Sequence, residues 1–165
     1  MKKKITAMLS IILSCFCISN SIVCYALTPS VQTTTAQRNY IAYRWTYYQR
    51  GYKEYNCLSY ALGNTSSWTW PWGSTATESE VTSYLSSKGY SKINYNNGMG
   101  PWANAKICSY GWGSDVKHFA KVITAGGAWT DDVIRAKWGQ CELFNHPDGN
   151  PYTNNEYGPL LGKYR

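Results

Sequence analysis

The order of apolar and polar residues predicts two helices in the first half of the chain. Asn56 offers a side-chain cap, and the run 57–62 reads as a short helix that Gly63 stops. The segment 77–80, Thr-Glu-Ser-Glu, has the spacing of a capping box and opens a second helix, which ends at Lys88-Gly89. The aromatic-rich segment 40–55 before them is expected to be helical in part.

The second half of the chain changes to a strand-like pattern. The stretches 106–110, 116–124 and 133–138 are short, rich in β-forming residues and separated by Gly or Asp. Side chains alternate between the two faces of a strand, so one face of 116–124 is apolar and the other basic. The apolar face holds Val116, His118, Ala120 and Val122, and the other holds Lys117 and Lys121. His118 is therefore expected to point toward the core.

The start of the chain has the layout of a secretory signal, predicted over residues 1–26. Three lysines at positions 2–4 precede an apolar run from Ile5 to Leu13, and small residues before Leu27 suit a signal peptidase. The alternative is a retained membrane anchor, against which polar residues inside the run and the cleavage site argue. Residues 27–39 are then a flexible polar lead, and residues 40–165 form the working domain.

Removing the signal leaves 139 residues (165 minus 26) and lowers the formal net charge from +7 to +4, because the three lysines leave with it. That length suits one domain. The mild charge argues against a nucleic-acid partner and suits the anionic polymers of a bacterial envelope. We expect a secreted or envelope-associated monomer without stable membrane insertion.

Three cysteines remain after removal of the signal: Cys57, Cys108 and Cys141. In an oxidising compartment two of them can pair, which leaves one thiol for chemistry or for a link to another chain. Cys108 and Cys141 both fall in strand-like stretches, so they are the expected disulfide, and Cys57 is the odd thiol. Three buried, reduced thiols are the alternative.

Cys57 and His118 together suggest nucleophilic catalysis. A thiol on the first turn of a helix has its thiolate stabilised by the helix dipole and by a nearby imidazolium. A lone histidine on an apolar strand face is more often a core residue than a catalyst, but His118 can serve as the base if it lies beside Cys57.

These residues also carry a resemblance to a known family. The matching segments are Tyr55-Asn56-Cys57, Tyr60-Ala61-Leu62-Gly63, His118-Phe119-Ala120-Lys121-Val122, Lys137-Trp138-Gly139, His146 and Tyr157-Gly158. They resemble poorly characterised, mostly bacterial domains similar to papain-like cysteine peptidases of the NlpC type. The resemblance implies an α+β, papain-like fold, with N-terminal helices packed on a small antiparallel β-sheet. It also implies that Cys57 is the nucleophile and His118 the base.

The third residue of such a site, a polar group that orients the imidazole, is not clear from the sequence. Alternation on 133–138 places Ile134, Ala136 and Trp138 on one face and Val133, Arg135 and Lys137 on the other, and none of them is an acceptor. The candidates are Gln140, Glu142, Asp132, His146 or a backbone carbonyl, of which Gln140 is preferred. Without an orienting residue the domain could be a pseudo-enzyme that keeps only the binding groove.

Other chemistry is less well supported by the sequence. A zinc site from Cys57, His118 and His146 lacks the usual ligand spacing, and no cofactor or metal is expected. Trp68, Trp70 and Trp72 alternate along a loop, where they either stack on a sugar or peptide or cover a small core. Two functions therefore remain. One is a cysteine hydrolase acting on an amide bond in a peptide or peptidoglycan-type substrate, and the other is an inactive binding module with an aromatic surface.

Overall fold

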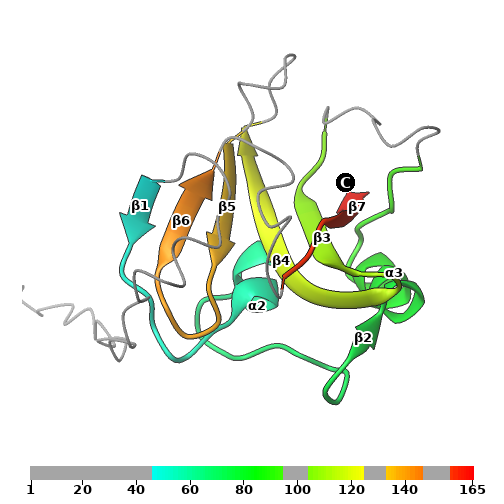
Figure 1. Cartoon of the computed structure of the whole chain (residues 1–165), viewed down its shortest axis with the longest axis horizontal. Helices are drawn as coiled ribbons and strands as arrows, with labels where there is room; N and C mark the ends of the chain where they lie inside the picture. Colours follow the sequence, from blue (N-terminus) through cyan, green and yellow to red (C-terminus); the bar gives the residue numbers. More distant parts are fainter. Residues whose placement is uncertain (1–45, 95–103, 125–132, 147–156) are drawn as a thin grey trace, which may run out of the picture.

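The computed structural model describes residues 46–94, 104–124, 133–146 and 157–165, which form seven strands and two helices (Figure 1). In chain order the elements are β1 (Thr46–Gln49), α2 (Cys57–Ala61), β2 (Ala76–Thr77), α3 (Glu78–Ser87), β3 (Ile107–Trp112), β4 (Asp115–Thr124), β5 (Val133–Lys137), β6 (Leu143–His146) and β7 (Leu160–Tyr164). The three strands expected from the sequence correspond to β3, β4 and β5.

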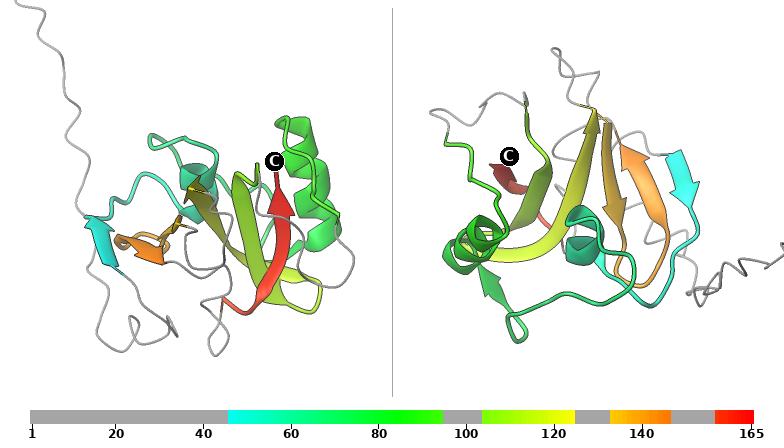
Figure 2. Two further views of the ribbon diagram at one scale, coloured as in Figure 1. Left: turned by 90° about the horizontal axis from the view of Figure 1, so that it is seen from above. Right: turned by 180° about the vertical axis from the view of Figure 1, so that it is seen from behind.

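The strands form one antiparallel sheet in the order β1-β6-β5-β4-β3-β7, and β2 pairs with β4 outside this path. The longest strand, β4, curves across the middle of the molecule (Figures 1 and 2). Its first residues pair with β2 and β3, whereas its last residues pair with β5. This curvature separates β5 from the start of β4, which is where the candidate site lies.

The predicted fold class, a papain-like α+β fold with N-terminal helices on a small sheet, is wrong. Of the described residues 41% are strand and 16% are helix, so this part of the chain is mostly antiparallel sheet. The described end of the segment 40–55, expected to be helical in part, contains the edge strand β1, which pairs with β6. Its sequence Thr-Tyr-Tyr-Gln is β-branched and aromatic, and such residues favour extended backbone beside a neighbouring strand.

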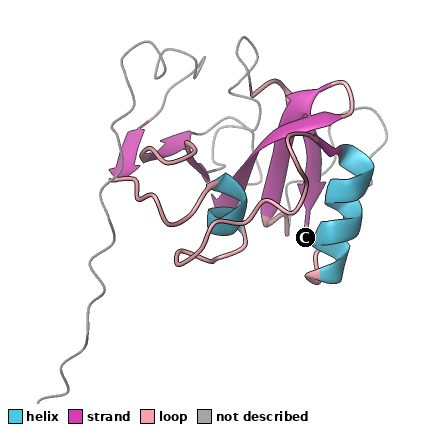
Figure 3. Cartoon of the chain, turned by 90° about the horizontal axis from the view of Figure 1, so that it is seen from below, coloured by secondary structure: helices cyan, strands magenta, loops and turns pink. Residues whose placement is uncertain are grey.

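Both helices begin where the sequence predicts, and both pack on the same face of the sheet (Figure 3). The Asn56 side chain accepts a hydrogen bond from the Ser59 backbone N–H (2.9 Å), and Thr77 and Glu80 form the predicted capping box. The apolar residues that join the two helices to the sheet include Leu58, Ala61, Val81, Leu85, Ile107, Val116, Phe119 and Tyr164. We call this set the helix-side cluster.

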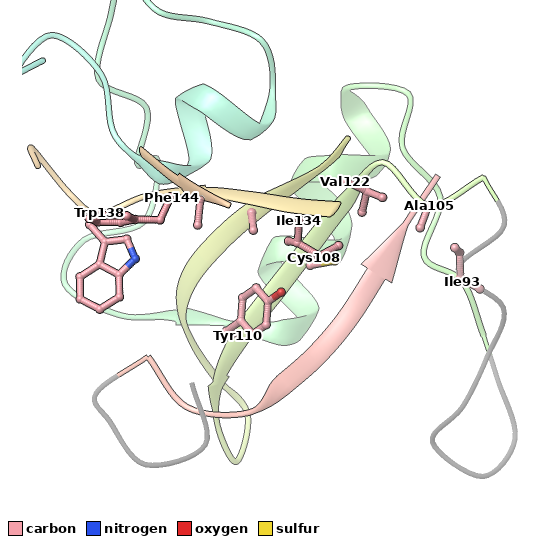
Figure 4. Close-up of a cluster of buried hydrophobic side chains, with 10 residues drawn as sticks. Ile93, Ala105, Cys108, Tyr110, Val122, Ile134, Trp138 and Phe144 are labelled. Atoms are coloured by element: carbon pink, nitrogen blue, oxygen red, sulfur yellow. The ribbon is translucent and has the colours of Figure 1, made fainter. Parts of the chain in front are cut away.

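A second cluster lies on the other face of the sheet, away from α2 (Figure 4). It includes the predicted inner face of β5, namely Ile134 and Ala136, with Trp138 just after the strand. Tyr110, Ala120, Val122 and Phe144 complete its centre. We call this set the far-side cluster. Since both faces of the sheet carry buried side chains, polar residues on either face of β4 and β5 can be buried.

A bulge in β4 changes which of its side chains share a face. Tyr110 pairs with His118 but Gly111 pairs with Val116, so Lys117 is an extra residue in β4. A Cβ on Gly111 would lie 1.8 Å from the Asp115 carbonyl oxygen, so only glycine fits here. The sequence pattern placed Val116 on the same face as Ala120, and this is wrong: Val116 packs in the helix-side cluster, whereas Ala120 packs in the far-side cluster.

The Cys108–Cys141 disulfide expected from the sequence is not formed in the structure. Cys108 lies in the middle of β3, whereas Cys141 lies on the turn between β5 and β6. Both β4 and β5 separate these positions, and neighbouring strands are about 4.8 Å apart. The Cα atoms of a disulfide lie within about 7 Å of each other, so the sheet keeps this pair apart.

The predicted signal, residues 1–26, and the predicted polar lead, residues 27–39, lie outside the described residues. The candidate orienting residue Asp132 also lies outside them. Within the four described ranges, neither helix is long and apolar enough to cross a bilayer.

Candidate functional site

Cys57 and His118, the two predicted catalytic residues, line the same pocket, whose volume is about 290 Å³. The pocket lies between the start of α2, the bulge of β4 and the turn after β5. Its walls are Asn56, Cys57, Trp68, Trp70, Lys117, His118, Gly139 and Tyr157. The fold therefore brings together residues that are far apart in the sequence, from a helix, a strand and two loops.

Asn56 fixes both the helix that carries Cys57 and the tryptophan loop beside it. Its Oδ1 accepts hydrogen bonds from the backbone N–H and the hydroxyl of Ser59, both at 2.9 Å. Its Nδ2 donates to the Thr69 carbonyl oxygen at 2.8 Å. Thr69 lies between Trp68 and Trp70, so one buried amide holds the pocket's aromatic wall against the first turn of α2.

Cys57 is the first residue of α2 and is only 6% exposed. Burial raises the pKa of its thiol to about 11, although hydrogen bonds from the backbone N–H groups of Phe119, Leu58 and Cys57 itself and the charge of Lys137 lower it. The sequence led us to expect a stabilised thiolate. Desolvation outweighs these donors, so Cys57 is a neutral thiol near pH 7.

His118 is buried, as its position on the apolar face of the strand predicted. Burial and, to a smaller extent, the charge of His146 lower the pKa of His118 to about 3. The imidazole is therefore neutral near pH 7, so no imidazolium at His118 stabilises the Cys57 thiolate. A neutral imidazole still has a ring nitrogen that can accept a proton.

Tyr157 stacks on the His118 ring, with ring centroids 4.0 Å apart and ring planes at 12°. Trp138 in turn contacts Tyr157 edge-to-face at 5.0 Å. The orienting contact that the sequence left open is thus provided in part by an aromatic face. Gln140, the preferred candidate, is exposed on the turn after β5 and is not among the described residues that line the pocket.

Lys137 is a residue near the site to which the sequence analysis gave no role. Alternation along β5 put it on the face opposite Ala136, and on that face it is fully buried. Its Nζ donates hydrogen bonds to the carbonyl oxygens of Gly139 (2.7 Å) and Cys141 (2.8 Å). The predicted helix at 57–62 was the signal that could have indicated the burial of Lys137, because that helix had to cover one face of the sheet.

The three tryptophans of the loop have two different roles. Trp68 is 50% exposed and presents an open aromatic face at the pocket. Trp70 and Trp72 pack edge-to-face on each other, and their ring centroids lie 5.9 Å and 6.2 Å from that of Phe119. The loop is therefore a lid over the helix-side cluster that leaves Trp68 available for contact with a ligand.

No group of three or more His, Cys, Asp or Glu residues among the described residues is arranged to hold a metal ion. The candidate zinc set of the sequence analysis, Cys57, His118 and His146, therefore does not form such a group. The chemistry available at this pocket is that of a thiol, an imidazole, an ammonium group and aromatic walls.

Comparison with known proteins gives this chain a family. Residues 46–165 match the model of a domain of unknown function, DUF7689, and the chain belongs to this family. The matched range contains every described strand and helix as well as the whole candidate pocket. No curated protein and no solved structure matches the chain significantly.

Proposed function

We propose that this protein is a cysteine hydrolase that cleaves an amide bond in a peptide, with Cys57 as the nucleophile and His118 as the general base. The observation that carries this proposal is that Cys57 and His118 line one pocket of about 290 Å³. A nucleophile and a base that line one cavity are one requirement for covalent catalysis of this kind, although Cys57 packs in the helix-side cluster and His118 lies on the far-side face with Tyr110.

The proposed reaction starts from a neutral pair. As the Cys57 sulfur attacks the amide carbonyl carbon, His118 takes the thiol proton, and the carbonyl oxygen becomes an oxyanion. Backbone N–H groups beside Cys57 stabilise that oxyanion. His118 then gives its proton to the leaving nitrogen, the C–N bond breaks, and an acyl-thioester remains on Cys57. Water, deprotonated by His118, releases the acid and restores the thiol.

The pocket walls suit a substrate with an apolar or aromatic group next to the amide. Trp68, Trp70 and Tyr157 supply flat apolar faces, and the exposed Lys117 supplies a positive charge at the same pocket. Peptides of the bacterial cell wall are one class of substrate with amide bonds and carboxylates. Together with the predicted signal, this supports action outside the cell or at its envelope.

A second candidate function is an inactive binding module, and the buried state of the two key residues favours it. Burial raises the pKa of Cys57 to about 11 and lowers that of His118 to about 3, so neither group is ionised near pH 7. In this case the aromatic walls would bind a glycan or a peptide without turnover. The two candidates differ in one measurable property, the covalent chemistry of Cys57.

Hydrolysis assays on the purified domain separate the two candidates. Wild-type protein is incubated with dipeptide 4-methylcoumarin amides and with purified peptidoglycan peptides, and the release of amine or of cleaved peptide is followed. The hydrolase proposal predicts turnover that is abolished in Cys57→Ala and retained in Cys108→Ala. Cys108 is the matched control, because it is a fully buried cysteine in the far-side cluster that does not line the pocket. Equal turnover in wild type and Cys57→Ala would overturn the proposal.

A further inference from the structure

Lys137 is a fully buried lysine at the end of β5, on the face of the sheet that α2 covers. Its Nζ donates hydrogen bonds to the carbonyl oxygens of Gly139 and Cys141 and lies 4.9 Å from the centre of the Tyr55 ring. Burying an ammonium group is costly unless polar partners compensate, so a buried lysine with these contacts calls for a functional explanation.

The contacts of Lys137 reach one wall of the pocket and the segment that leads into Cys57. Gly139, which accepts one of its hydrogen bonds, is a pocket wall. Tyr55, whose ring lies beneath the ammonium group, is two residues before Cys57 and stacks on Tyr60 of the same segment, with centroids 6.3 Å apart. Lys137 therefore lies between the segment that carries the nucleophile and the turn that forms another wall of the pocket.

Lys137 is also a basic group that carries a charge at neutral pH and acts on Cys57. Burial lowers the pKa of Lys137 to about 8, which leaves most of it protonated at pH 7, whereas the pKa of His118 is about 3. The charge of Lys137 acts on Cys57 and favours its thiolate. The titratable groups that act on the ammonium are Cys141, Cys57, Glu54 and Glu142.

We infer that Lys137 is a positioning residue for Cys57: its buried ammonium group stabilises the Cys57 thiolate and holds the Gly139 wall of the pocket in place. The inference rests on the proposed function, since a stabilised thiolate matters for a nucleophile. In this arrangement the positive charge that stabilises the thiolate comes from Lys137, behind the pocket, and not from an imidazolium. His118 can then act as a neutral base.

The test is the pH dependence of Cys57 alkylation by iodoacetamide, followed on the Cys57 peptide by mass spectrometry. In Lys137→Met we expect alkylation at pH 8 to be on the order of tenfold slower than in wild type, because the neighbouring positive charge is lost. The rise of the rate with pH should also move to higher pH. Lys137→Arg, which keeps the charge, should restore most of the rate.

Lys163→Met is the matched control, because Lys163 is an equally buried lysine on β7 that does not line the pocket. Its alkylation profile should coincide with that of wild type. If Lys137→Met fails to fold by circular dichroism, Lys137→Gln gives the same test, since the amide can still donate to Gly139 but is uncharged. An unchanged profile in a folded neutral variant overturns the inference.

Alkylation does not require hydrolysis, so the two claims can fail separately. If wild-type protein cleaves no amide but neutral variants of Lys137 slow alkylation, the charge effect stands and the hydrolase proposal fails. If Cys57-dependent cleavage is found but the alkylation profile does not change in neutral variants of Lys137, the hydrolase proposal stands and the inference about Lys137 fails.

Discussion

Tyr157 lies almost flat on His118, with ring planes at 12° and ring centroids 4.0 Å apart. Gly158 makes this approach possible. Its φ is 71°, and a Cβ there would lie 2.2 Å from the Gly111 carbonyl oxygen, so a larger residue would push this segment off the β3–β4 hairpin. The sequence pair Tyr157-Gly158 thus places an aromatic ring over the candidate base.

This stacking predicts that replacing Tyr157 changes the ionisation of His118. In Tyr157→Ala solvent reaches the imidazole, so the pKa of His118 should rise from about 3 toward its ordinary value of 6.5. Tyr157→Phe keeps the stacked ring and should leave the pKa low. NMR titration of the His118 ring protons measures both. Tyr84→Ala, which removes a ring that packs on Trp72, is the control and should leave His118 unaffected.

If His118 is the base, kcat should also be affected more by Tyr157→Ala than by Tyr157→Phe. Tyr157→Phe should hydrolyse substrate at close to the wild-type rate, and Tyr157→Ala should lose on the order of tenfold in kcat because the imidazole is no longer held in one orientation. A Tyr157→Ala variant with unchanged kcat and an unchanged His118 titration would contradict the positioning role.

The low pKa of His118 also predicts acid sensitivity of the fold. The unfolded chain binds a proton at His118 below about pH 6.5, whereas the folded protein does so only near pH 3. Between these values the unfolded state holds the extra proton, so the free energy of unfolding falls as the pH falls. One such group contributes a slope of at most about 1.4 kcal/mol per pH unit.

Urea denaturation at pH 7, 5.5 and 4 measures this slope. In His118→Gln the part of the slope due to His118 should be missing, so stability should decline less on acidification than in wild type. Carboxylates titrate in both proteins and cancel in the comparison. Parallel declines in the two proteins would mean that His118 does not carry the depressed pKa.

Local signals predicted the cap at Asn56 and the burial of His118, but they did not predict the fold. Both features are set by neighbouring residues, and both are found in the structure. The strand β1 and the burial of Lys137 depend on contacts with β6 and α2, which no local pattern contains. The bulge that places Val116 on the helix side likewise depends on how β3 meets β4.

The absence of the Cys108–Cys141 disulfide has the same origin. Both cysteines fall near strand-like sequence, and only the strand order shows that two strands separate them. The orienting contact of His118 was missed for another reason. The sequence analysis expected a hydrogen-bond acceptor next to β5, whereas a contact that the fold supplies is a stacked ring from the segment before β7.

The proposed location outside the cell predicts the mature N-terminus. Intact-mass analysis of protein secreted by a bacterial host should give a chain that begins at Leu27, or within a residue or two of it, because small residues precede that position. A variant with Ala26→Arg should accumulate as precursor. Recovery of full-length chain with Met1 in the membrane fraction would contradict the prediction.

The most direct measurement of the central claim is a double-mutant cycle on kcat/KM with Cys57→Ser, His118→Ala and the double variant, each shown to be folded by circular dichroism. A nucleophile and its base act as one unit. We therefore predict that each single variant loses nearly all hydrolysis and that the double variant is no slower than the slower single one. Full hydrolysis in Cys57→Ser, or a double variant whose loss equals the product of two modest losses, would contradict the account.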